Sequence, residues 1–253
     1  MTRRPPSGEG ASDTGNAVRM ARTPNLNALT TDELARFTTA QVRALTTTQI
    51  ANLTTGNLDA LGTAQYAALT SDQVNALTTG QVRALETADV RSITTAALAG
   101  LTSTQVGALT TDGVQALTTA QVAALTSDQL KGMTTADMVA LTSSQVAALN
   151  SIQAPSLNTD QLRAIEVADI KALSTAAVRA LSNTQIDALT SDQLRALTSA
   201  QLNALSEEQL GAIETADVAA LSTYQISKLA TASLALLSTD QVVALSTAQI
   251  ASL

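Results

Sequence analysis

The chain of 253 residues contains no cysteine, no histidine and no tryptophan. Without cysteine it cannot form disulfides or use a thiol nucleophile, and without histidine it lacks the commonest metal ligand and general base. Only one phenylalanine and two tyrosines are present, whereas a globular core of this size normally uses more large anchors. These absences favour a narrow, repetitive core of aliphatic side chains.

Long apolar runs and an excess of basic residues are also missing. No run approaches the roughly 18 apolar residues that span a membrane, and residues 1–23 lack the apolar core of about 7–15 residues that signal peptides carry. The net charge is −7, with a surplus of two positive charges in residues 1–23. An acidic body argues against nucleic-acid binding, which needs a basic surface.

The chain is instead built from an eight-residue unit, which reads LTTAQVAA at residues 117–124. Near-copies run from Leu29 to the closing Leu253 and make 28 octads with positions a to h. Position a is always Leu, Ile, Met or Phe, and position f is apolar throughout. Position b is Thr or Ser in 21 octads, and position e is Gln or Glu in 19. Such self-similarity indicates a repeat architecture.

The octad carries the pattern of a helix start. In residues 117–124, Thr118 and Gln121 have the spacing of a capping box, in which each side chain satisfies a free backbone N–H of the first turn. Leu117 and Val122 lie where a hydrophobic staple packs. The pattern therefore predicts a chain of very short helices, each of about six or seven residues, with a corner at each a–b step.

Two other architectures fit the pattern less well. In one continuous helix the apolar stripe would rotate by about 80° per octad, so no stable face would form. A β-solenoid would suit the threonine pairs and the Val or Ile at f, but strict alternation is missing and only 11 glycines are present. We therefore predict an all-α, elongated solenoid of very short capped helices, with the β-solenoid as the alternative.

The domain organisation follows from the repeat. Residues 1–23 are polar and rich in Gly, Ser and Pro, which predicts a disordered tail, or alternatively an uncleaved export signal. Residues 24–253 form the predicted octad-repeat solenoid. Its irregular octad is 149–156, where Pro155 removes a helical hydrogen bond. We expect a bend or shortened helix there, with Ile152 filling the core in place of the small Ala154.

A longer period is visible where aspartate replaces Gln at position e. Successive aspartates of this kind are separated by six, four and six octads, all even numbers, which predicts two octads per solenoid turn. A copied block of ten octads would explain the same spacings, because residues 86–98 resemble residues 166–178. The aspartates are Asp89, Asp137, Asp169 and Asp217.

Paired carboxylates are the first candidates for chemistry, since they could bind a cation or act as acid and base. Their place at helix starts explains them equally well, because the helix dipole favours negative charge there. The pairs are Glu86 with Asp89, Glu166 with Asp169 and Glu214 with Asp217, and the basic partners expected nearby are Arg83, Arg91, Arg163 and Lys171. Position d carries a further series of aspartates, expected on a solvated ridge: Asp32, Asp72, Asp112, Asp128, Asp160, Asp192 and Asp240.

Other signs of an enzyme are missing from the sequence. No histidine can activate the Thr and Ser hydroxyls, and the phosphate-binding patterns GxxxxGK[ST] and GxGxxG are absent. We predict no catalytic, cofactor or metal site, and a non-enzymatic protein.

Two features point to protein contacts instead. Tyr224 replaces a surface residue at position d and is the candidate contact residue, whereas Tyr66 at position f should fill the core with its hydroxyl at an edge. The last two octads, LSTDQVVA and LSTAQIAS, keep the full apolar pattern where a solenoid normally ends in a polar cap. We therefore expect the C-terminal layer to expose apolar side chains at a and f and to mediate self-association.

The runs LTTAQVAALTSDQL (117–130) and LTSDQLRALTSAQLNAL (189–205) resemble the ALTTxQ[VIL] octad arrays of large bacterial proteins, described as surface, adhesin-like or haem-utilisation proteins. The resemblance implies a bacterial protein that is exported or displayed at the cell surface, and it assigns no site residue. The expected function is a structural or protein-binding scaffold. The alternative is a secreted effector that binds a host protein through the solenoid face.

Overall fold

The computed structural model describes residues 26–253, so the expected tail at residues 1–23 lies outside the described part of the chain. The chain divides after Gly100 into two compact units, which we call unit 1 and unit 2 and describe separately. All regular elements of residues 26–253 are helices, namely 27 short α-helices and two 3₁₀ turns. The all-α prediction is confirmed, and the β-solenoid alternative is wrong for these residues.

Unit 1 follows the octads one by one, with a helix in each. Its elements are η1 (Leu26–Ala28), α2 (Thr31–Ala35), α3 (Thr39–Arg43), α4 (Thr47–Ala51), α5 (Thr55–Asp59), α6 (Thr63–Tyr66), α7 (Ser71–Asn75), α8 (Thr79–Ala84), α9 (Thr87–Ser92) and α10 (Thr95–Leu98).

Unit 2 continues the same pattern over residues 101–253. Its elements are α11 (Ser103–Val106), α12 (Thr111–Ala116), α13 (Thr119–Ala124), α14 (Ser127–Gly132), α15 (Thr135–Ala140), α16 (Ser143–Ala148), η2 (Ala154–Ser156), α17 (Thr159–Ala164), α18 (Val167–Ile170), α19 (Thr175–Ala180), α20 (Asn183–Asp187), α21 (Ser191–Ala196), α22 (Ser199–Asn203), α23 (Glu207–Ala212), α24 (Thr215–Ala220), α25 (Thr223–Ser227), α26 (Thr231–Leu234), α27 (Thr239–Ala244) and α28 (Thr247–Ile250).

A capping box begins most of the helices. Thr118 has extended backbone angles, its Oγ1 accepts from the N–H of Gln121 at 3.1 Å, and its own N–H donates to Gln121 Oε1 at 2.7 Å. Leu125, the next a residue, is again extended and ends the helix. Positions a and b thus form every corner. The helices contain four to six residues, fewer than predicted, because position h also lies outside the helix in many octads.

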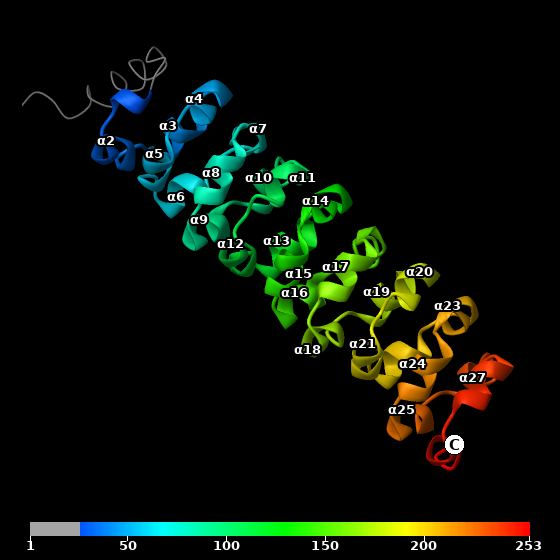
Figure 1. Ribbon diagram of the computed structural model, residues 1–253. Helices are drawn as coiled ribbons and strands as arrows, with labels where there is room; N and C mark the ends of the chain where they lie inside the picture. The colour runs from blue at the N-terminus through cyan, green and yellow to red at the C-terminus, as the bar shows by residue number, and fades with distance from the viewer. Residues whose placement is uncertain (1–25) are drawn as a thin grey trace, which may run out of the picture. The chain divides into compact units, whose positions relative to one another are not determined.

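Three octads make one turn. Within unit 1, α5 packs on α2 and on α8, and within unit 2, α20 packs on α23 and α24 packs on α27, as Figure 1 shows. Within each unit, helices therefore pack on helices that lie three octads further along the chain. The prediction of two octads per turn is wrong.

The spacing of the aspartates predicted the wrong number of octads per turn, because that number does not determine where the aspartates occur. All three sides of a turn share the same pattern at positions a, b, e and f, so the residues that build the helices and corners carry no three-octad variation. Asp137 and Asp169 are four octads apart, which is not a multiple of three, so position in the turn cannot explain their spacing. A copied block of ten octads is compatible with any turn length.

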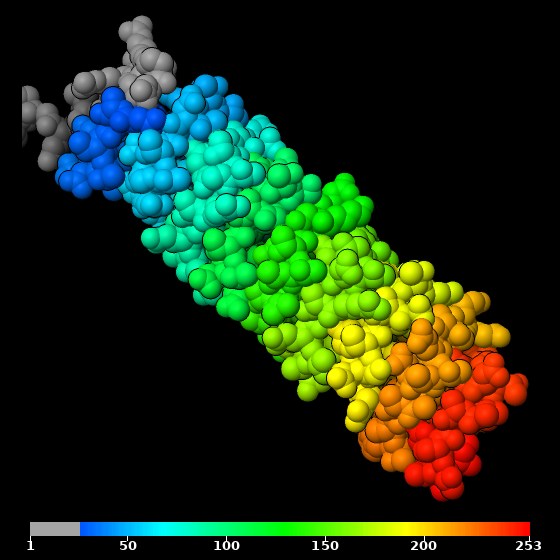
Figure 2. Space-filling view, viewed as in Figure 1, coloured from blue at the N-terminus to red at the C-terminus, as the bar shows by residue number. Residues whose placement is uncertain are grey.

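The core is a column of a and f side chains. In unit 2, Leu130, Val146 and Leu162 at position f are completely buried, and Figure 2 shows successive turns in direct contact on the visible face. The backbones of α14 and α11 approach so closely that a Cβ atom on Gly132 would collide with the carbonyl of Ser103. Glycine is required there for steric reasons.

The irregular octad is a shortened helix, as predicted, but Ile152 does not fill its core. Ile152 is 75% exposed, while Ala154 at position f is completely buried. The reason is local: the N–H groups of Ile152 and Gln153 both donate to Asn150 Oδ1, which holds position d outward. Gln153 Nε2 donates to the carbonyl of Leu125 at 2.8 Å, so the three-octad period continues through this octad.

Candidate functional site

The position-e glutamine is the residue that joins one turn to the next. Gln145 Oε1 accepts from the N–H of Thr142 at 2.8 Å and completes the capping box. Its Nε2 donates at 2.8 Å to the carbonyls of Val114 and Leu117, which belong to the turn below. One buried amide therefore caps the start of its own helix and satisfies carbonyls at the end of α12 and at the corner that leads into α13, the helix beneath it.

The same arrangement recurs in both units. The Nε2 atom donates to the carbonyl 28 residues earlier at 2.6–3.0 Å in every case below. In unit 1 the glutamines are Gln65, Gln73 and Gln81, and in unit 2 they are Gln129, Gln145, Gln153, Gln161, Gln185, Gln193, Gln201, Gln209, Gln225, Gln241 and Gln249. A glutamate could complete the box but could not donate, which explains the preference for glutamine.

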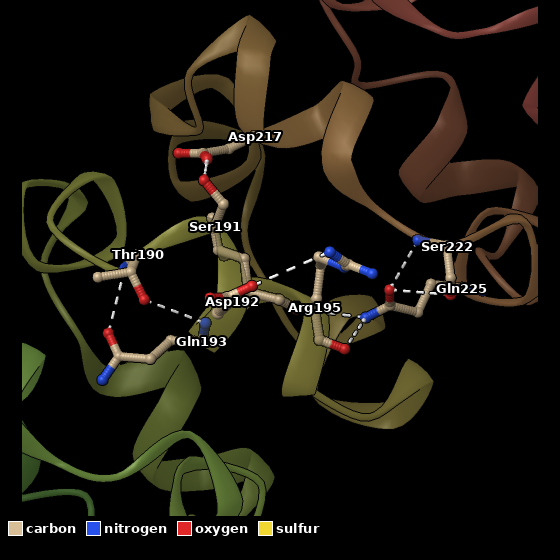
Figure 3. A network of polar contacts seen from close by, with 9 residues as sticks. Thr190, Ser191, Asp192, Gln193, Arg195, Asp217, Ser222 and Gln225 are labelled. Atoms are coloured by element: carbon tan, nitrogen blue, oxygen red, sulfur yellow. Dashed lines mark hydrogen bonds and ion pairs between the residues drawn. The ribbon is translucent and has the colours of Figure 1, made fainter.

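At two octads, an aspartate at position e reverses the polarity of this contact. In Figure 3, Ser191 Oγ donates upward to Asp217 Oδ1, whereas nearby Gln225 Nε2 donates downward to the carbonyl of Arg195 at 3.1 Å. Ser143 Oγ donates to Asp169 Oδ1 in the same way. A serine at position c of the turn below thus supplies the donor that a carboxylate lacks.

Asp89 is accommodated differently, beside Tyr66. The Tyr66 hydroxyl donates at 3.1 Å to the carbonyl of Leu58, the position-f acceptor that a glutamine in place of Asp89 would use. The pKa of Asp89 is raised to about 6, chiefly by burial; the N–H of Glu86 at 3.3 Å lowers it, and the charges of Glu86 and Asp59 raise it. Burial and Asp89 also raise the pKa of Tyr66, so its hydroxyl stays a donor.

Tyr66 is completely buried and fills the core, as its position predicted, but its hydroxyl lies inside rather than at an edge. The candidate carboxylate pairs are likewise separated by burial. Asp89, Asp169 and Asp217 are buried between turns, while their partners Glu86, Glu166 and Glu214 are exposed. The two acids of a pair therefore face different surroundings, and the described residues contain no cluster of three or more His, Cys, Asp or Glu that could hold a metal ion.

The charges on the surface are solvated. The position-d aspartates are exposed, as expected of a ridge in water, and Asp128 pairs with Lys131 at 3.1 Å while Asp192 pairs with Arg195 at 3.9 Å. Arg163, expected to pair with a carboxylate, instead donates from Nε to the carbonyl of Ala188 at 2.6 Å. The two exposed ion pairs, Asp128 with Lys131 and Asp192 with Arg195, contribute little to stability.

Tyr224, the candidate contact residue, lies on the surface of α25. Its side chain is 67% exposed, and Lys228 Nζ lies 5.8 Å from the centre of its ring. An exposed aromatic ring under a cation offers a rigid, partly apolar surface for another protein.

The last turn also exposes apolar side chains. At position f, Val242 is 42% and Ile250 is 45% exposed, whereas the f residue is buried in every octad up to Ile226. Position a differs from the expectation, because Leu245 remains buried at 8% and Leu253 is the exposed member. The final turn thus presents an apolar row at position f rather than at both positions.

Sequence reasoning missed the asparagines at position g. Asn203 Oδ1 accepts from the N–H of Ala230 at 2.7 Å, and Asn27 Oδ1 accepts from the N–H of Thr54 at 3.0 Å. Both receiving octads lack glutamine at e and have Ser233 or Asn57 there. In both cases the cap residue follows the position-g asparagine by the same number of residues. This constant spacing is the sequence signal that could have revealed asparagine in the place of glutamine.

Six segments of the chain match the ALTTAQ repeat family, at residues 23–55, 55–87, 82–119, 162–199, 191–223 and 210–247. The chain belongs to the ALTTAQ repeat family. A comparison with curated proteins gives no match. The ALTTAQ repeat is here a helical octad, three of which close one turn. Across residues 26–253 the helices are all too short to cross a bilayer.

Proposed function

We propose that this ALTTAQ repeat protein is a non-enzymatic structural and protein-binding scaffold that self-associates through its C-terminal turn. We further propose that it acts as part of a bacterial surface or secreted protein, a placement supported by the octad arrays that its sequence resembles. The observation that carries the proposal is the exposed apolar row at Val242 and Ile250, on a fold whose f residues are buried up to Ile226.

The chemistry of the side chains supports a scaffold rather than an enzyme. The hydroxyls of Thr118 and its counterparts accept capping hydrogen bonds, and the chain has no histidine to activate them. The buried acid Asp89 lies next to the completely buried Tyr66, where a substrate would have no access. The repeated, regular surface is instead suited to contacts with other proteins.

Self-association is the expected use of the exposed row. In inner turns, the f side chain is covered by the next turn, which removes its apolar surface from water. A second copy that covers Val242 and Ile250 with its own Val242 and Ile250 would provide the same burial, since such a contact is self-complementary about a two-fold axis. Val243, which is 78% exposed beside them, would extend the contact.

Sedimentation equilibrium over a dilution series tests the proposal. The chain should associate as its concentration rises, and Val242→Lys with Ile250→Lys should remove the C-terminal contact, and so lower the average mass, by placing two charges in that contact. Ala216→Lys, an exposed residue on α24, is the control and should dimerise like the unchanged chain. A dimer unaffected by the two lysines, or a persistent monomer of the unchanged chain, would overturn C-terminal association. Protease accessibility on intact cells tests the surface placement separately.

A further inference from the structure

One side of unit 2 carries no carboxylate over its last five octads, and we call it the acid-free face. It comprises residues 149–156, 173–180, 197–204, 221–228 and 245–252, each octad the third after the one before. Its helices are η2, α19, α22, α25 and α28. Because one turn takes three octads, these five elements lie above one another on the same side.

The stacking of this face is held by the glutamines. Gln201, Gln225 and Gln249 each donate to the carbonyl that opens the octad below, at 2.6, 3.0 and 2.8 Å. In addition, α19 packs on η2 and on α22, and α28 packs on α25. The face is therefore a continuous, rigid surface within unit 2.

Charge and exposed apolar area distinguish this face from the other two. Residues 149–252 contain ten acidic side chains, and all ten lie on the other two sides. The acid-free face has the exposed cations Arg179 and Lys228, and its most exposed large side chains are Ile152 at 75% and Tyr224 at 67%, with Ile250 of its last octad at 45%. An exposed aromatic and an exposed aliphatic anchor on the same face as two cations are the composition of a protein contact.

A neighbouring side of the same unit has the opposite character. Its exposed acids, which we call the acidic ridge, are Asp160 on α17, Asp187 on α20, and Glu207 and Glu208 on α23. These helices are stacked, since α20 packs on both α17 and α23. The N–H of Glu208 itself and a hydrogen bond from Ser206 Oγ at 2.8 Å lower the pKa of the Glu208 carboxyl, which keeps it ionised.

We propose that the acid-free face of one copy binds the acidic ridge of a second copy, so that two chains associate side by side. The octads that carry Arg179 and Lys228 begin at 173 and 221, which are two turns apart, and Asp160 and Glu208 are also two turns apart. Two stacks with the same rise per turn can therefore bring both cations opposite acids at once. Ile152 and Tyr224 would then be buried against the second copy.

This inference rests on the proposed role as a protein-binding scaffold, but the residues that it uses on the acid-free face, Ile152, Arg179, Tyr224 and Lys228, do not include Val242 or Ile250 of the C-terminal contact. The net charge of −7 opposes association of two copies at long range. At about 0.15 M salt the Debye length is roughly 8 Å, so distant charges are screened while contacting pairs are not. Local complementarity then decides the contact, and each copy retains a second complementary side for a further neighbour.

Charge reversal and rescue test the inference. Arg179→Glu with Lys228→Glu should weaken side-by-side association of the full chain at least tenfold, because both cations would become acids facing acids. Asp160→Lys with Glu208→Lys should weaken it similarly. A mixture of the two variants should associate again as a heterodimer, detected by sedimentation with one variant fluorescently labelled. The control, Lys171→Glu with Arg195→Glu on the third side, makes the same change in net charge and should behave like the unchanged chain.

The outcomes separate this inference from C-terminal association. If the variants with Glu at 179 and 228 associate as the unchanged chain does, or if the mixture fails to restore association, the side-by-side contact is wrong. If Val242→Lys with Ile250→Lys alone abolishes all association, C-terminal contact stands and the side-by-side contact is overturned. If those lysines change nothing while charge reversal abolishes association, the opposite conclusion holds.

Discussion

Glutamine and aspartate at position e both form a hydrogen bond to the turn below, but with opposite polarity. We call the two arrangements a glutamine corner and an aspartate corner. At Gln145 the amide donates to two carbonyls of the turn below, and at Asp217 the carboxylate accepts from Ser191 of the turn below. The backbone is the same in both, with an extended cap residue followed by a short helix. The turn-to-turn contact therefore needs one donor and one acceptor, and either turn can supply the donor.

The third variant, at Asp89, shows what happens when neither turn supplies that donor to the carboxylate directly. Tyr66 satisfies the carbonyl below, and the carboxyl responds with a raised pKa of about 6. The three corners thus rank by how well the buried polar group is matched. Glutamine is matched in full, aspartate with serine is matched through one hydroxyl, and Asp89 is matched only partly.

Among changes to the polar residues of the corners, the largest effect is expected from converting a glutamine corner into an unmatched acid. Gln145→Glu keeps the box oxygen but places a carboxylate against the carbonyls of Val114 and Leu117, and should cost about 3 kcal/mol in the free energy of unfolding at pH 7. Urea unfolding measures this. Gln41→Glu at a partly exposed position is the control and should cost less than about 1 kcal/mol, since water solvates the charge. Equal costs at the two positions would show that Nε2 donation is unimportant.

Removing the donor from an aspartate corner should have the next largest effect. Ser191→Ala leaves the buried Asp217 carboxylate without its hydroxyl and should cost about 1–3 kcal/mol. Ser199→Ala is the matched control, because Ser199 has the same place in the sequence relative to Gln225, which supplies its own donor. That change should stay within about 0.5 kcal/mol. The comparison fails if the two alanine variants unfold at the same urea concentration.

Asp89 should show a pH dependence that its asparagine variant lacks. The folded pKa of about 6 lies above the ordinary value of 3.8, so the folded state binds more protons between these pH values. Stability should therefore fall as the pH rises from about 4 through 6 and then level off. Relative to Asp89→Asn, the unchanged chain should lose on the order of 1 kcal/mol across this window. A constant difference from pH 4 to pH 7 would contradict the assignment.

The smallest effect is expected from the capping hydroxyl, which both kinds of corner share. Thr118→Ala removes one acceptor and should cost about 1 kcal/mol. Leu117→Ala, at the buried neighbouring position, should cost more, about 2–5 kcal/mol. Thermal unfolding of the two variants compares them directly. A larger loss for the cap than for the core would reverse the roles assigned to positions a and b.

Much of the local structure could be predicted because it is encoded within one octad. The cap at Thr118, the box with Gln121 and the buried staple of Leu117 and Val122 all involve residues at most five positions apart. The number of octads per turn could not be predicted in this way. It depends on how corners close in space, and the bond from Gln145 to Leu117 spans 28 residues with no distinguishing residue in between.

The candidate surface was predicted in part. Tyr224 at position d is exposed, as its place in the octad indicated, whereas Ile152 was placed in the core because Ala154 seemed too small. Hydrophobicity alone suggested that Ile152 takes the place of Ala154 in the core, but the Asn150 cap fixes which side of the short turn faces outward. The grouping of Ile152 with Tyr224 depends on the three-octad turn and so could not be seen without the structure.

The distance between engineered cysteines tests the three-octad turn most directly, since the native chain has none. Spin labels on Ala176→Cys and Ala200→Cys, three octads apart and exposed on the stacked helices α19 and α22, should report neighbours one helix spacing apart, about 8–10 Å between axes. Labels on Ala200→Cys and Ala216→Cys, two octads apart, should lie on different sides. The account predicts the shorter distance for the three-octad pair. A shorter distance for the two-octad pair would contradict it.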